Sequence, residues 1–112
     1  MSIIHEQRRA GEFLLSEANG KLSREKITVT GGNYPAGQVL ARQADGRHTA
    51  YDPEGDAPLN TAAALLFAPT DASEADQSGI GIVRLAEVSA ALLVDADQQA
   101  LTDLSAQFII AR

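Results

Sequence analysis

The chain has 112 residues, a formal net charge of −6 and no cysteine. This length predicts one domain, and the lack of cysteine excludes a disulfide framework and Cys-based zinc sites. The negative charge argues against a nucleic-acid surface, which needs clustered Lys and Arg, and against docking on anionic lipid. No apolar run approaches the roughly 20 residues of a membrane span, and charges within residues 1–10 argue against a secretion signal.

The N-terminal part of the chain places an apolar block, Phe13, Leu14 and Leu15, in front of a polar turn and a charged run. The block fits one helical turn or an extended segment, and it is too short for a stable helix alone. We interpret residues 1–30 as an arm whose apolar side chains meet another surface, and residues 31–112 as the body. The alternative is that the block folds back onto the chain's own sheet, because exposed apolar clusters favour aggregation.

Strand patterns follow the arm. Ile27 and Val29 alternate with polar residues, which places them on one face of a strand. Asp45-Gly46 between two short strand-like runs predicts a hairpin. Pro69 ends an apolar run that fits a strand or a helix, and its short length favours a strand. The expected strands are residues 25–30, 38–42, 47–51, 61–68, 79–86 and 108–111.

One helix is expected near the C-terminus, over residues 95–107. Asp95 can cap it, with Gln98 as the reciprocal partner of a capping box. Ala100, Leu101 and Leu104 then fall on one face. The sequence therefore predicts an α+β class that is mostly β, with one short helix and an extended N-terminal arm.

The titratable and glycine-rich stretches match no catalytic or cofactor motif. His5 and His48 lie far apart and outside any metal-ligand spacing. The acidic stretches 52–60 and 70–78 alternate carboxylates but lack the geometry of a calcium loop, which favours solvated loops. Residues 32–37 have the glycine spacing of a phosphate loop without its Lys and hydroxyl. We expect no catalytic, metal or cofactor site, with a small hydrolase using the first acidic loop as an alternative.

The segment GEFLLSEANGKLSRE, residues 11–25, resembles the N-terminal signature of the phage head decoration protein family, the relatives of the lambda-type protein D. Ala41 and Ala64 stand where that family has glycines, and Leu85 where a polar residue is usual, which leaves the local backbone there open. The similarity covers nearly the whole chain and continues in PAGQVLARQADGRHTAYDP (35–53), the apolar run with TDA (62–72), IVR and AEV (82–88) and FIIAR (108–112).

This resemblance implies a structural virion protein and not an enzyme. Such proteins form homotrimers on the outer surface of the expanded phage capsid, at threefold and quasi-threefold positions, and stabilise the shell against the pressure of packaged DNA. The implied fold is small and β-rich, of β-tulip or barrel type. The implied partner is the major capsid protein, with no cofactor, nucleic acid or membrane. The implied location is the virion, preceded by the host cytoplasm during assembly.

The resemblance also implies that the arm pairs with a strand of the major capsid protein. An extended arm of 20 residues spans up to roughly 65 Å, which is enough to reach a neighbouring subunit. Strand addition would supply backbone hydrogen bonds, with alternate side chains giving specificity. The alternative function is a small β-barrel module for ligand binding or for tail or host attachment, with a concave apolar pocket. The predicted capsid-binding residues of the arm are Glu12, Phe13, Leu14, Leu15, Ser16, Glu17, Ser23, Arg24, Glu25, Ile27 and Val29.

Overall fold

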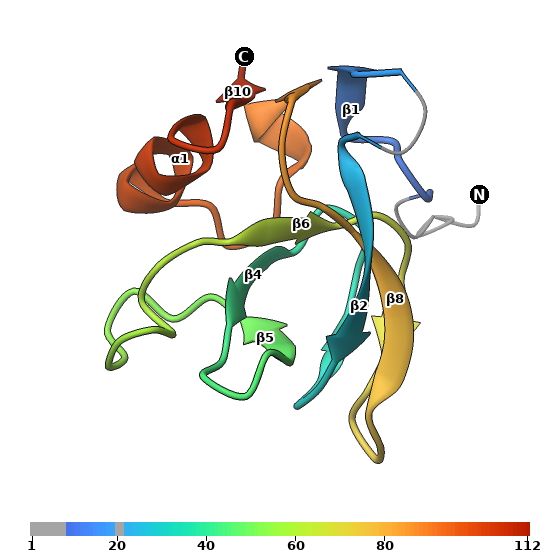
Figure 1. The fold of residues 1–112 in the computed structure, drawn as a ribbon, viewed down its shortest axis with the longest axis vertical. Helices are drawn as coiled ribbons and strands as arrows, with labels where there is room; N and C mark the ends of the chain where they lie inside the picture. The colour runs from blue at the N-terminus through green and yellow to red at the C-terminus, as the bar shows by residue number, and fades with distance from the viewer. Residues whose placement is uncertain (1–8, 20–21) are drawn as a thin grey trace, which may run out of the picture.

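The fold is mostly β, as expected, and it closes into a small barrel (Figure 1). A computed structural model describes residues 9–19 and 22–112. The elements are β1 (Leu14–Glu17), β2 (Arg24–Val29), β3 (Asn33–Tyr34), β4 (Val39–Arg42), β5 (His48–Ala50), β6 (Ala64–Leu66), β7 (Thr70–Asp71), β8 (Gln77–Ile82), β9 (Ala86–Val88), a 3-10 turn (Ala90–Leu92), α1 (Gln98–Ser105) and β10 (Ile109–Ala111).

The barrel has the strand order β2-β5-β4-β6-β8. β2 pairs antiparallel with β8 along all of its six residues. Ile27 and Val29 point into the barrel and are buried, which confirms the alternation seen in the sequence. β4 and β5 form the predicted antiparallel hairpin, with Gly46 in the left-handed conformation in its turn (φ 91°). The run that Pro69 ends is the buried strand β6.

A second, three-stranded sheet lies at one end of the barrel and is built from both ends of the chain (Figure 1). Its central strand is β9, with β1 antiparallel on one side and β10 parallel on the other. We call it the terminal sheet. The stretch 79–86 was expected to be one strand, but β8 ends at Ile82 and β9 begins at Ala86. Leu85 has a left-handed backbone (φ 56°), and this turn separates the two strands.

Two apolar clusters fill the interior. The smaller one lies within the barrel around Val29, Leu40 and Leu66. The larger one joins the barrel to the terminal sheet and the helix, so the two sheets share one continuous core. Ala41 and Ala64, the two alanines at expected glycine positions, lie fully buried in regular strands. The largest fully buried side chains of the joining cluster are those of Phe13, Val39, Leu65, Ile82, Val88, Leu104 and Ile109.

The helix starts later than the sequence predicted, and its cap is Asp97 and not Asp95. An Asp97 carboxylate oxygen accepts from the Ala100 N–H at 2.8 Å. Asp95 has a left-handed backbone (φ 63°), and its carboxylate accepts from the side-chain amide of Gln38 at 2.9 Å. A parallel bridge between Gln38 and Val94 holds this part of the chain against the barrel, which delays the start of the helix.

The acidic stretch 70–78 is also more ordered than the predicted loop. It contains β7, which pairs antiparallel with β3, and the first residues of β8. This pairing joins residues far apart in the sequence, so local composition gave no sign of it. The stretch 52–60 is a loop, as predicted. Within the described residues, no helix is long and apolar enough to cross a membrane.

Candidate functional site

The described part of the N-terminal segment is attached to the body. The Gly11 N–H donates to the Phe67 carbonyl oxygen at 2.8 Å. A Cβ on Gly11 would lie 2.8 Å from the Phe67 ring, and the backbone is left-handed (φ 68°), so this position requires glycine. Phe13 is 1% exposed and sits in the shared core. Its carbonyl oxygen accepts from the Ser89 N–H at 2.8 Å, which begins the pairing of β1 with β9.

A polar cluster ties the end of β1 to the start of β2. The Glu17 carboxylate accepts from the Arg24 guanidinium, with Nε at 3.1 Å and Nη2 at 2.5 Å, and from the Ser23 hydroxyl. The hydrogen bond from Arg24 is the main cause that lowers the pKa of Glu17, and Ser23 adds to it. The Arg24 guanidinium also lies 4.2 Å above the centre of the Phe67 ring. This cluster therefore holds β1 and β2 together.

The outward side of the same segment is an open sheet edge. β1 lies at one edge of the terminal sheet, so within residues 9–19 and 22–112 one row of its backbone groups has no neighbouring strand. Leu15 is 56% exposed on this strand, and Ser16 beside it donates to the Glu87 carboxylate at 2.8 Å. An exposed edge with an apolar side chain can accept a strand from a partner.

The predicted arm residues thus fall into distinct environments, and their role as partner contacts stays a prediction. Leu14 is half-buried against the core, and Glu25 is exposed and pairs with Arg84 at 2.8 Å. In the single chain β2 belongs to the barrel, so residues 24–29 lie within the body. Phe13, Ser23, Ile27 and Val29 are buried, Glu17 and Arg24 form the polar cluster, and Glu12, Leu15, Ser16 and Glu25 face solvent.

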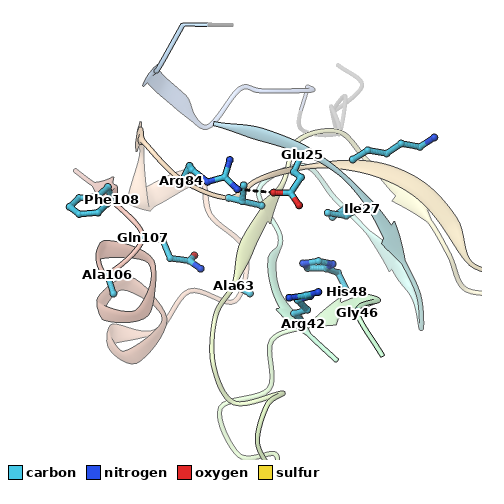
Figure 2. Close-up of a pocket in the computed structure, with 12 residues that line it drawn as sticks. Glu25, Ile27, Arg42, Gly46, His48, Ala63, Arg84, Ala106, Gln107 and Phe108 are labelled. Atoms are coloured by element: carbon cyan, nitrogen blue, oxygen red, sulfur yellow. Dashed lines mark hydrogen bonds and ion pairs between the residues drawn. The ribbon is translucent and has the colours of Figure 1, made fainter. Parts of the chain in front are cut away.

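A cavity of about 480 Å³ lies between the barrel and the end of the helix (Figure 2). Arg42 from β4 and His48 from β5 lie side by side on one wall, and Gln107 lies on another. His48 is 7% exposed, and burial, followed by the nearby charge of Arg42, lowers its pKa. His48 Nδ1 and Gln107 Oε1 are buried without a hydrogen-bond partner in the described chain. A buried polar group without a partner lowers the free energy of unfolding by about 1–3 kcal/mol. The wall of this cavity therefore contains two polar atoms that reduce stability.

Two exposed apolar residues, of which Phe108 lines this cavity, have unusual backbones. Leu85 and Phe108 both have left-handed conformations (φ 56° and 64°) and are 41% and 68% exposed. The N–H of Ala86 donates to the Phe108 carbonyl oxygen at 3.1 Å, which holds the two turns together. Strained backbone at non-glycine residues is concentrated at functional sites.

Sequence reasoning missed the cavity and the paired turns at Leu85 and Phe108. The cavity walls come from β2, the β4–β5 hairpin, the turn after β8 and the end of α1, which are far apart in the chain. The only signal was Leu85 itself, which stands where the resembled family has a polar residue. In the described part of the chain, no three His, Asp or Glu side chains gather to hold a metal ion.

Comparison with known proteins decides the family. The family model described as Bacteriophage lambda head decoration protein D matches residues 3–109 of the chain. The chain belongs to this family. No curated protein and no solved structure matches it.

The head decoration family is a structural capsid family and not an enzyme family, and membership implies binding to the phage capsid and a place on the virion. The mostly β fold with its small barrel, expected from the sequence, fits this assignment.

Proposed function

We propose that this head decoration protein binds the outer surface of the expanded phage capsid as a homotrimer, at threefold and quasi-threefold positions. There it stabilises the shell against the pressure of packaged DNA. The partner is the major capsid protein, and the N-terminal segment makes the contact. The observation that carries the proposal is the open edge of β1, with Leu15 exposed on it, in a chain of the head decoration family.

The burial pattern refines which arm residues make this contact. Phe13 and the Glu17–Arg24 pair hold β1 in place on the body. Leu15 is exposed, and it and the outer edge of β1 are available to a capsid strand. A docked strand would gain backbone hydrogen bonds along the edge and would bury the Leu15 side chain. The buried residues thus position the contact, and the exposed ones make it.

A trimer strengthens such a contact by multivalency. One short edge of four residues supplies few hydrogen bonds and little buried area. Three edges on one trimer act together, because the first contact raises the effective concentration of the other two at the shell. Clamping three capsid subunits in this way resists their separation under pressure.

The test uses expanded heads that carry none of this protein. Purified protein is added, its position is determined by electron cryo-microscopy, and the temperature at which filled heads release DNA is measured. We expect occupancy at threefold and quasi-threefold positions and a higher release temperature. Heads that bind no protein would contradict the function, and bound protein without a change in release temperature would contradict the stabilising role.

A further inference from the structure

The cavity between the barrel and the end of the helix is lined by donor groups that lack a partner within the described chain. Arg42 is exposed and makes no ion pair within residues 9–19 and 22–112. It lies beside the His48 ring on the same wall (Figure 2). The guanidinium of Arg84, by contrast, is already paired with Glu25 at 2.8 Å. Arg42 is therefore a cation that is available to a ligand in this cavity.

The His48 ring adds a second donor. The imidazole forms no hydrogen bond with the described residues, and its Nδ1 atom is buried without a partner. Nε2 is therefore the ring nitrogen that a ligand can reach. Burial, together with the charge of Arg42, lowers the pKa of His48, so the ring is mostly neutral at pH 7 and carries one N–H. With its proton on Nε2, His48 donates into the cavity beside Arg42.

Gln107 supplies a third donor from another wall of the cavity, just after α1 (Figure 2). Its Oε1 atom is buried without a partner, so the amide Nε2 is the group that faces a ligand. A guanidinium, an imidazole N–H and an amide NH2 all donate hydrogen bonds. Such a lining favours a negatively charged ligand that is rich in oxygen acceptors. The volume of about 480 Å³ lies within the range of small-molecule sites.

We propose that this cavity binds a small carboxylate that carries further oxygen acceptors, such as a sugar acid. The carboxylate accepts two parallel hydrogen bonds from the planar guanidinium of Arg42 and one from His48 Nε2. A second oxygen-bearing group of the ligand accepts from the Gln107 amide. The site is separate from the outer edge of β1, so it goes beyond the proposed capsid contact and does not depend on it.

Nuclear magnetic resonance titration of the isotope-labelled full chain tests the site with three probes at constant ionic strength. Glucuronate has both the charge and the extra oxygens, acetate has only the charge, and glucose has only the oxygens. We expect glucuronate to shift the signals of Arg42, His48 and Gln107 with a dissociation constant of about 1 mM. Acetate and glucose should each bind at least about tenfold more weakly. Glucuronate that shifts none of these signals would overturn the proposal.

Variants assign the contacts. Arg42→Gln keeps a donor but removes the charge, and it should weaken glucuronate binding at least about tenfold. Gln107→Met keeps the length of the side chain without its donor, and it should weaken binding about fivefold. Arg112→Gln makes the same change of charge outside the cavity and should bind as the natural chain does. The spectrum of each variant shows whether it is folded. Equal affinity of folded Arg42→Gln and the natural chain would overturn the site.

The pKa of His48 gives a readout that does not depend on any substitution. Two charged groups act on it in the single chain: Arg42 lowers this pKa and Glu25 raises it. A carboxylate bound beside the ring adds a negative charge, so the pKa of His48 should rise at saturating glucuronate and stay constant in glucose. An unchanged pKa at saturating glucuronate would show that the ligand binds elsewhere, which refutes the assignment.

Binding to expanded heads separates this inference from the proposed function. Saturating glucuronate and the Arg42→Gln change should both leave head binding unaltered, because the proposed capsid contact lies on β1. Glucuronate binding by a chain that does not bind heads would refute the proposed function and leave the ligand site standing. Loss of head binding in Arg42→Gln, with no glucuronate binding by the natural chain, would show that the cavity receives a group of the capsid and would refute the ligand site.

Discussion

The barrel and the terminal sheet differ in whether their edge strands are paired. The barrel closes on itself, so each of its five strands has two neighbours. In the part of the chain that the structure describes, the terminal sheet has three strands, and β1 and β10 leave two edges open. Closure removes the edges that would otherwise pair with other chains. The open edges therefore mark the terminal sheet as the part of the molecule that is available to a partner.

Exposed apolar side chains follow the same division. Among the large exposed apolar residues of the described chain, only Ile80 lies in a barrel strand. Leu15 and Ile110 lie in the terminal sheet, and Leu85 and Phe108 lie at the turns that lead into it. Both of those turns have left-handed backbones. The barrel therefore supplies stability, and the terminal sheet presents surface, with Phe13 joining the two.

Truncating Phe13 should have the largest effect on the free energy of unfolding. Phe13→Ala would leave a cavity in the core shared by the barrel and the terminal sheet, at a cost of about 3–5 kcal/mol. Urea unfolding monitored by circular dichroism measures the loss. Glu12→Ala, a change at the exposed neighbour, is the control and should shift the midpoint little. An unchanged midpoint in Phe13→Ala would mean that β1 is not part of the folded body in solution.

The link between the barrel and the helix should be the next most costly to break. Asp97 caps α1 and accepts from the Tyr51 hydroxyl at 2.9 Å at the end of β5. Asp97→Ala removes both interactions, and we expect a loss of about 1–2 kcal/mol. Asp95→Asn keeps an acceptor for Gln38 and should cost less than about 0.5 kcal/mol. Equal losses in the two variants would contradict the assignment of Asp97 as the cap.

The pH dependence of stability should show two separate windows. The pKa of His48 is lowered below its ordinary 6.5, so the unfolded chain takes up a proton first and stability falls as pH drops below about 6.5. One such group gives a slope of at most about 1.4 kcal/mol per pH unit. The pKa of Glu17 is lowered below 4.5 by Arg24, so its contribution is lost as pH falls below that value.

Two variants, studied by urea titration at a series of pH values, test whether His48 and Glu17 cause these two windows. His48→Gln should flatten the first window and leave the second. Glu17→Gln should reduce the slope of the second and leave the first, because Asp45, Asp71, Asp76 and Glu87 also have lowered pKa values and keep part of the second. A His48→Gln profile that matches the natural chain between pH 5 and 6.5 would show that His48 is solvated and titrates normally.

Local patterns in the sequence were enough to place three of the barrel strands, β2, β4 and β5, while the expected strand 79–86 is divided by the turn at Leu85. The alternation of Ile27 and Val29 and the Asp45-Gly46 turn depend on neighbours in sequence, and both predictions are confirmed. The cap at Asp97 was missed, because the bridge between Gln38 and Val94 decides where the helix starts. Long-range contacts of this kind leave no local signature.

The candidate site, too, was only partly predictable from local sequence. The sequence marked the apolar block of residues 13–15 as important, but it did not distinguish the residue that is buried from the one that is exposed. That distinction depends on the pairing of β1 with β9, more than sixty residues away along the chain. The cavity was invisible in the sequence for the same reason, since its walls meet only in the folded chain.

The smallest expected effect on stability belongs to the exposed residue of β1. Leu15→Asp should change the free energy of unfolding by less than about 0.5 kcal/mol, because the side chain is already largely in solvent. Ile80→Asp places the same charge on the barrel and is the matched variant. Urea unfolding of both proteins provides the comparison. A large loss in Leu15→Asp alone would mean that Leu15 is buried in solution, within the protein's own assembly.

The most direct test of the account is the affinity of these two variants for expanded heads. The protein bound to heads is measured against concentration for the natural chain, Leu15→Asp and Ile80→Asp. If the open edge of β1 makes the capsid contact, Leu15→Asp binds at least about tenfold more weakly, while Ile80→Asp binds as the natural chain does. Equal affinity of Leu15→Asp and the natural chain would contradict the assignment of capsid binding to the terminal sheet.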